Sequence, residues 1–222
     1  MIYAEFQPIV RLVDTQVVGY EALARKRIGD RIIPTSQWLP EFLTTPEGSL
    51  KLTEIMFAEV VNIISSLPAE MFIAINVEAK DFHAGPWQGI ADKTGILDHK
   101  DQIIIEISER GAVHESAVSL AEKAREHGFR LALDDIGAGS ARLIEVVDLA
   151  PDVLKLDVEI IPRLGNERMQ ILVRGICNII TQLGGITLIE GIETENQAQD
   201  CLSLGIELGQ GFLYGKPGLL TL

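Results

Sequence analysis

Six predicted strands in this chain each carry a polar side chain at or near their C-terminal end. The strands are short and apolar, and helical patterns separate them, which favours a parallel sheet. An open sheet concentrates its functional groups at one switch point, whereas a closed barrel brings all strand ends to one mouth. The pattern therefore predicts an α/β fold, a TIM-like (β/α)8 barrel with its site at the C-terminal face. The six positions are Asn76, Glu106, Asp134 with Asp135, Lys155, Glu190 and Gln210.

Two further strands are expected before this series, at residues 5–12 and 17–23, as an antiparallel hairpin. A helix entry is expected at 34–38, with Ser36 as one candidate cap, ahead of a long helix at 50–67 that Pro68 ends. Three more helices are expected at 115–127, 166–183 and 193–204. The six strands themselves are expected at 71–76, 102–109, 129–135, 153–157, 186–191 and 206–211.

Composition bounds the class of protein. The 222 residues are 47% hydrophobic, which suffices for one sizeable core, so residues 1–222 are expected to form a single domain. The net charge of -13 argues against binding a nucleic-acid polymer or an anionic membrane surface. No apolar stretch reaches membrane-spanning length and residues 1–5 lack a signal-peptide pattern, so a cytoplasmic location is expected. Cys177 and Cys201 fit reduced core thiols, although a disulfide between them stays open.

The adjacent acids Asp134 and Asp135 follow the apolar strand residues 131–133 and precede Gly137. Two carboxylates at the end of a buried strand repel each other and lose hydration, so they need a counter-charge. A divalent metal ion supplies that counter-charge most simply. The alternative is a turn or helix-capping role, since Asp before Gly is common in turns.

The complete set of oxygen donors suits Mg²⁺ or Mn²⁺, because carboxylate and amide oxygens are hard ligands. So many carboxylates in one place favour two ions, and two-metal sites typically hydrolyse phosphoesters with an activated water. Asp134 is the candidate bridging ligand, and Lys155 could orient the water or stabilise phosphoryl charge. Each residue has a structural alternative: Glu21 could pair with Arg25, and Lys155 with Asp157 or Asp135. The expected metal ligands are Glu21, Asn76, Glu106, Asp134, Asp135 and Glu190.

An ordered series of motifs resembles the EAL-domain family of bacterial cyclic-di-GMP phosphodiesterases, and it runs through nearly the whole chain. Residues 5–10 and 19–25 resemble the opening motifs of the family, and residues 19–25 include the signature Glu21-Ala22-Leu23. The later motifs are Ala74-Ile75-Asn76-Val77, Glu106-Ile107-Ser108-Glu109, Asp134-Asp135-Ile136-Gly137-Ala138-Gly139, the lysine strand 151–157, Glu190-Gly191-Ile192-Glu193-Thr194, and Gln210-Gly211-Phe212 with Lys216-Pro217 after it.

The resemblance implies a modified (β/α)8 barrel with one antiparallel strand and metal-dependent hydrolysis of cyclic-di-GMP to linear pGpG. It implies that the six donors above bind two Mg²⁺ or Mn²⁺ ions and that Lys155 contacts the nucleophilic water. Asp135 and Glu109 are expected to take part in catalysis, Glu109 by holding the loop after the Asp pair. Arg25, Gln7 and Gln210 are expected at the substrate, with Arg25 on a phosphate. A homodimer and a fused or separate sensory domain are the expected protein partners.

The sequence also departs from the family pattern. The aromatic residue and the tyrosine of the family's loop are replaced by Ile136 and Ser140, and the segment from Ile28 to Leu50 is shorter than usual. These changes keep two alternatives open. One is a catalytically weak module with the same fold that binds cyclic-di-GMP or a protein, and the other is a barrel enzyme acting on a different phosphoester.

Overall fold

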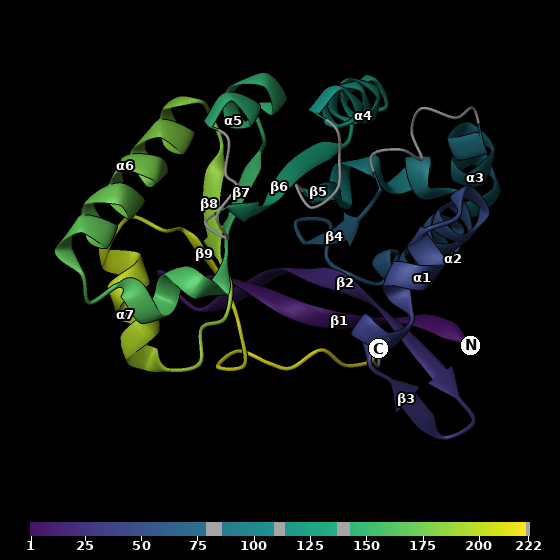
Figure 1. Cartoon of the computed structure of the whole chain (residues 1–222), viewed down its shortest axis with the longest axis horizontal. Helices are drawn as coiled ribbons and strands as arrows, with labels where there is room; N and C mark the ends of the chain where they lie inside the picture. The colour runs from purple at the N-terminus through teal and green to yellow at the C-terminus, as the bar shows by residue number, and fades with distance from the viewer. Residues whose placement is uncertain (79–85, 109–113, 137–142, 221–222) are drawn as a thin grey trace.

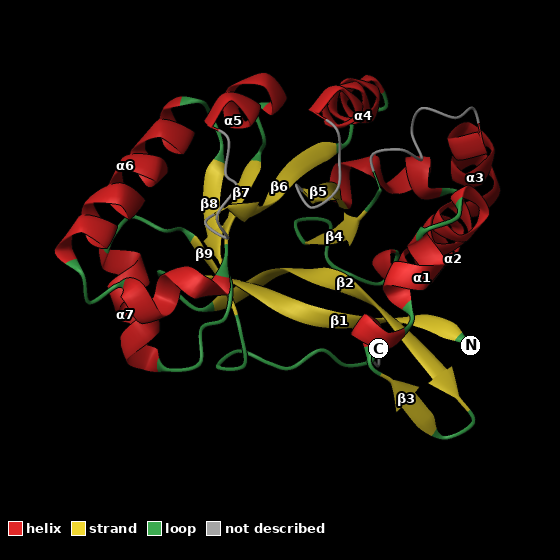
Figure 2. Cartoon of the chain, in the orientation of Figure 1, coloured by secondary structure: helices red, strands yellow, loops and turns green. Residues whose placement is uncertain are grey.

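Eight strands close into a barrel in the computed structural model, which describes residues 1–78, 86–108, 114–136 and 143–220. The order around the barrel is β1-β2-β4-β5-β6-β7-β8-β9, and β9 pairs back with β1. Helices lie outside the parallel strands β4 to β9, and the C-terminal segment passes along the side of β1 (Figures 1 and 2). The predicted TIM-like barrel is confirmed. The strands are β1 Ile2–Arg11, β2 Gln16–Ile28, β4 Phe72–Asn76, β5 Ile103–Ser108, β6 Arg130–Ile136, β7 Val153–Leu156, β8 Ile186–Ile189 and β9 Leu208–Gln210.

One strand runs against all the others. β1 pairs antiparallel with β2 on one side and with β9 on the other, while every remaining neighbour in the barrel is parallel. The expected N-terminal hairpin supplies this reversed strand. β2 continues beyond the barrel to pair with the short strand β3, Arg31–Ile33, which the sequence pattern did not predict.

Helices connect most of the parallel strands, as the βα alternation requires. The predicted helix 50–67 begins earlier, at Pro46, because Thr45 caps it by accepting a hydrogen bond from the Gly48 amide. Ser36 is not a cap: it lies within the 3₁₀ turn Thr35–Gln37, whose preceding residue makes no side-chain capping bond. The helices are α1 Leu39–Leu43, α2 Pro46–Ile64, α3 Pro86–Thr94, α4 His114–Glu126, α5 Leu143–Leu149, α6 Glu167–Gln182 and α7 Glu195–Ser203, with further 3₁₀ turns at Ile96–Gln102 and Val158–Arg163.

Two apolar layers stabilise the barrel. One lies between the strands and the helices, and the other fills the interior of the barrel. Side chains two residues apart share a face of a strand, so the inner layer determines what lies above it. On each strand from β4 to β9, the residue two positions after the last apolar residue of the inner layer is polar, as in Ala74 and Asn76 or Val153 and Lys155. On the reversed strand β1 the polar residue Gln7 comes two positions before Ile9. The inner layer consists of Ile9, Phe72, Ala74, Ile104, Ala132, Val153, Leu188 and Leu208.

None of the described helices combines the length and the apolar character that crossing a membrane requires.

The two cysteines lie buried on α6 and α7 as free thiols, as expected for core residues. Burial raises the pKa of the Cys201 thiol to about 12 and also raises that of Cys177. The reactive thiolate is therefore scarce at neutral pH.

We expect both thiols to be unreactive towards an aromatic disulfide reagent at pH 8 in the native protein, because at a pKa of about 12 only about one Cys201 in 10⁴ is ionised. Absorbance titration should detect the thiols only after denaturation. The substitution Cys201→Ser should lower the number of thiols detected in the denatured protein by one. Rapid labelling of the folded protein, or no thiols in the unreduced denatured protein, would contradict this arrangement.

Candidate active site

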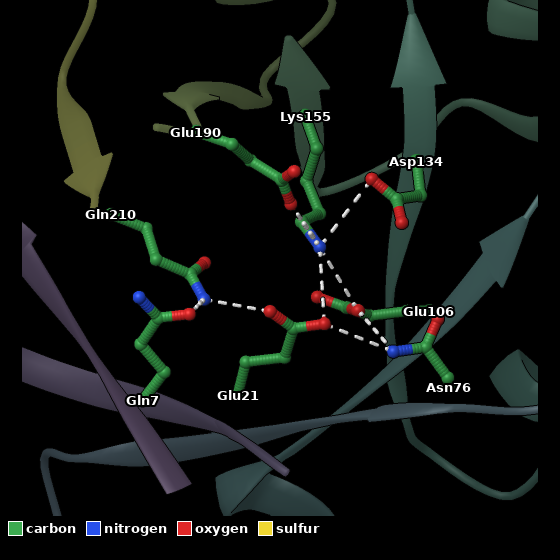
Figure 3. A network of polar contacts seen from close by, with 8 residues as sticks. All are labelled: Gln7, Glu21, Asn76, Glu106, Asp134, Lys155, Glu190 and Gln210. Atoms are coloured by element: carbon green, nitrogen blue, oxygen red, sulfur yellow. Dashed lines mark hydrogen bonds and ion pairs between the residues drawn. The ribbon is translucent and has the colours of Figure 1, made fainter. Parts of the chain in front are cut away.

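A lysine lies at the centre of the polar layer at the C-terminal mouth of the barrel (Figure 3). Lys155, on β7, is 1% exposed, and its Nζ lies among carboxylates from four other strands or strand ends. The four carboxylates come from positions far apart in sequence, so only barrel closure brings them together. The distances from Nζ are 2.8 Å to Glu190 Oε1, 3.1 Å to Glu106 Oε2, 3.4 Å to Asp134 Oδ1 and 3.5 Å to Glu21 Oε1.

The ammonium of Lys155 stays charged despite its burial. Burial alone would lower its pKa, but Glu106, Glu21, Glu190 and Asp134 together raise it well above the usual value. The structural alternative of a pair with Asp157 is wrong, because Asp157 instead accepts a hydrogen bond from the Glu159 amide at 2.7 Å and caps a 3₁₀ turn. The Asp135 side chain, the other candidate partner, lies outside the described residues.

Asn76 joins two of the carboxylates. Its Nδ2 donates to Glu21 Oε1 and to Glu106 Oε2, each at 3.0 Å. Asn76 and Glu106 are register partners on the adjacent strands β4 and β5, which explains the second contact. Because both bonds use the amide nitrogen, neither of them uses the Oδ1 atom, which is an acceptor that could bind a cation.

Two glutamines hold the opposite side of Glu21. Gln210 Nε2 donates to Glu21 Oε2 at 2.7 Å and to Gln7 Oε1 at 3.0 Å. Gln7 Nε2 in turn donates to the Gly215 carbonyl at 3.2 Å. Glu21 therefore faces inward and takes part in the site, and its alternative pairing with Arg25 is wrong.

The single positive charge of Lys155 does not balance the negative charges that four carboxylates can carry. Burial raises the pKa of Glu106 well above its usual value against the pull of Lys155, and the neighbouring acids add to the rise. Burial likewise raises the pKa of Glu190 to about 7. For Glu21 burial works in the same direction, but Lys155 and the hydrogen bonds from Gln210, Glu106 and Asn76 prevail and lower its pKa. The site thus has an excess of negative charge, which a divalent cation would relieve.

The donor chemistry fits a hard divalent cation, because every group other than Lys155 offers oxygen. Within the described residues no three acidic, histidine or cysteine side chains converge closely enough to hold a metal ion as they stand. The carboxylates converge on Lys155 Nζ instead. The residues that would hold a cation are Glu21, Asn76, Glu106, Asp134 and Glu190. Glu109, the side chain of Asp135 and the altered loop 137–142 lie outside the described residues, so their expected roles remain predictions.

The site opens into a cavity of about 380 Å³ lined by Gln7, Glu21, Asp134, Glu190 and Gln210. Glu193 and the exposed aromatic ring of Phe212 also line it, and neither was predicted to face the site. Both positions belong to motifs that were recognised, but their side chains come from turns beyond the strand ends, where alternation gives no signal.

Arg25 lies in a second cavity, of about 300 Å³, that Asn76 and Leu23 also line. Leu23 borders the first cavity too, so the two are neighbours. The guanidinium Nε of Arg25 is 2.9 Å from Glu5 Oε2, a partner that the sequence reasoning missed. The rest of the wall comes from β2, α1, α2, Thr35 and the two residues that follow β4.

The model of the EAL domain family matches residues 2–217. The chain belongs to this family. Among curated relatives, the probable cyclic di-GMP phosphodiesterase PdeD of Escherichia coli K12 is 27% identical over 220 residues, which cover 95% of this chain and 40% of that protein. PdeB of the same organism, also named a probable cyclic di-GMP phosphodiesterase, is 29% identical, and the match covers 97% of this chain and 42% of the relative. This EAL domain therefore spans less than half the length of these relatives.

Solved structures give the same family. The PaMucR phosphodiesterase in complex with c-di-GMP superposes with a TM-score of 0.82 at 25% identity, covering 98% of this chain and 92% of that one. The Klebsiella pneumoniae BlrP1 complex with manganese and cyclic-di-GMP also gives a TM-score of 0.82 at 25% identity, covering 98% of this chain and 56% of its own. Those neighbours share the fold and are complexes with the cyclic dinucleotide, in one case together with manganese.

We expect Lys155→Met to destabilise the metal-free EAL domain by about 3–5 kcal/mol, because removing one partner leaves buried carboxylates uncompensated. Chemical denaturation followed by circular dichroism measures the loss. Mn²⁺ should restore more stability to this variant than to the wild type. Lys51→Met, which breaks only an exposed pair with Glu54, should cost less than about 1 kcal/mol. Equal losses in the two variants would contradict the central role of Lys155.

Proposed function

We propose that this EAL domain, as one catalytic unit over residues 1–222, hydrolyses cyclic-di-GMP to linear pGpG with two Mg²⁺ or Mn²⁺ ions. The observation that carries the proposal is the convergence of Glu21, Glu106, Asp134 and Glu190 on Lys155 at the mouth of the barrel. Five of the six expected ligands, Glu21, Asn76, Glu106, Asp134 and Glu190, come together among the described residues, and the side chain of the sixth, Asp135, lies outside them. The family supplies the substrate class.

The chemistry requires a nucleophile, charge neutralisation and an orienting donor. When bound, the cations would activate a water molecule and offset the phosphoryl charge. In hydrolysis the water oxygen forms a bond to phosphorus, the bond to the 3′-oxygen breaks, and a proton ends on that leaving oxygen. Lys155 is the donor that would orient the water, because its ammonium keeps its proton and is held by carboxylates on several sides. Asp134 would bridge the cations, with Asp135 as a further ligand.

The other proposed roles concern the substrate and the surrounding chain. Arg25 would bind a phosphate from the cavity beside Asn76, and Gln210 would support the substrate from the other side. Glu109 would hold the loop that follows the Asp pair. We also propose that the protein is cytoplasmic and forms a homodimer. A fused or separate sensory domain would control it, since the relatives PdeD and PdeB are more than twice as long as this chain.

We expect purified protein to release pGpG from cyclic-di-GMP in the presence of Mg²⁺ or Mn²⁺, and chelation to stop the reaction. Glu21→Gln should lower kcat by at least about 100-fold, since changes even around a metal ligand commonly cost 10–100-fold. Chromatography of the products gives the rate. Glu122→Gln, on the exposed face of α4, is the matched control and should leave the rate unchanged.

The product assay together with a binding measurement distinguishes an active phosphodiesterase from a binding module and from an enzyme with another substrate. Tight cyclic-di-GMP binding in calorimetry, without product, would favour a binding module, for which the substitutions at Ile136 and Ser140 are the motivating observation. Faster cleavage of another phosphodiester would point to a different substrate. Absence of both binding and turnover would overturn the proposed function.

For Arg25→Ala we expect KM for cyclic-di-GMP to rise by about 10-fold or more, because a charge-assisted hydrogen bond to phosphate is lost. Steady-state kinetics at saturating metal measures the change, and Arg31→Ala on the exposed β3 hairpin is the control. If Arg25 only holds Glu5, then Arg25→Ala and Glu5→Gln should both lower stability while KM stays constant.

A further inference from the structure

The amide chain beside Glu21 carries an inference that rests on the proposed function and goes beyond it. The C-terminal segment after β9 returns to β1, where the backbone groups of Phe6 and Gly218 exchange hydrogen bonds of 2.8 and 3.1 Å. Gly215 lies against Pro8 so closely that an added Cβ would stand 2.8 Å from the proline Cγ. This approach places the Gly215 carbonyl beside Gln7.

The Gly215 carbonyl determines which way the Gln7 amide faces. A carbonyl oxygen only accepts, so Gln7 must turn its Nε2 towards Gly215, and the contact measures 3.2 Å. Its Oε1 then faces Gln210, from which it accepts at 3.0 Å. Both ends of the Gln7 amide are therefore engaged by protein atoms.

Two neighbouring acceptors determine the orientation of the Gln210 amide. Gln7 Oε1 and the carboxylate of Glu21 are both acceptors, and both require the Nε2 of Gln210 (Figure 3). Flipping the amide would turn its oxygen towards two acceptors and lose two hydrogen bonds. With Nε2 so placed, Gln210 Oε1 is a buried acceptor that has no partner atom among the described residues. The side chain is 3% exposed and lines the cavity with Glu190.

We propose that Gln7 is a positioning residue that acts through Gln210. Held by the Gly215 carbonyl, Gln7 sets the Gln210 amide so that Nε2 orients the Glu21 carboxylate and Oε1 remains a buried acceptor. The ligand of that acceptor is a hydrogen-bond donor, such as a water molecule. Gln7 thereby differs from a residue that contacts cyclic-di-GMP, and the C-terminal segment becomes part of the active-site support.

Measuring Mn²⁺ affinity without substrate distinguishes the two roles. Gln7→Met removes the amide at similar size, and we expect Mn²⁺ affinity in calorimetry to fall about 10-fold, as for other groups that orient metal ligands. At saturating Mn²⁺, kcat should fall while KM for cyclic-di-GMP stays within about twofold. A raised KM with unchanged Mn²⁺ affinity would overturn the inference in favour of direct substrate contact. Gln182→Met, on an exposed turn of α6, is the matched control.

A double-mutant cycle tests whether Gln7 acts through Gln210. Because the two amides form one chain, Gln7→Met combined with Gln210→Met should reduce Mn²⁺ affinity no further than Gln210→Met alone. Additive losses would overturn the inference while leaving the proposed function intact. If the wild type neither binds Mn²⁺ nor turns over cyclic-di-GMP, the proposed function fails. In that case the same double-mutant cycle is measured on the temperature of thermal unfolding. Non-additive changes in this temperature support the inference, and additive changes overturn it.

Discussion

The contact on which the mouth of the barrel depends is the one between the Lys155 ammonium and the carboxylates around it. Four acids this close together would repel one another, and burial would push them towards their neutral forms. Burial raises the pKa of Glu106 and Glu190 and the neighbouring acids add to the rise, so Lys155 offsets burial and repulsion only in part. The site therefore keeps a demand for further positive charge, which is the property that a metal-dependent hydrolase needs.

The apolar layer inside the barrel determines the level at which the polar side chains lie. Residues such as Ile104 and Val153 fill the interior, and the polar side chains stand one step further along the same faces. Water is excluded below the site and the donors are carried on hydrogen-bonded strands, so the carboxylates are held without long loops. Carboxylates supported this way can be oriented by hydrogen bonds from side-chain amides, as Asn76 and Gln210 show.

The reversed strand β1 has a function in this arrangement besides closing the barrel. Because it runs against its neighbours, Gln7 precedes the apolar residue Ile9, and its amide reaches the same level as Glu21 on the paired strand β2. The C-terminal segment then packs on β1 through Gly215 and Gly218. The first and last parts of the chain thus support one carboxylate from opposite ends of the sequence. This places active-site support outside the acidic motifs that characterise the family.

The sequence by itself determined the fold class, the reversed hairpin and the identity of the oxygen donors. Those follow from local signals: alternation in strands, helical spacing, and the recurrence of a polar residue at or near the C-terminal end of each predicted strand, such as Asp134. Only the tertiary structure decided which groups meet. That Lys155 pairs with Glu190 and not with Asp157, that Arg25 takes Glu5, and that Gln7 faces Gly215 all depend on barrel closure and strand register. No local pattern encodes these contacts, because they depend on the register between strands and on packing between segments that lie apart in the sequence.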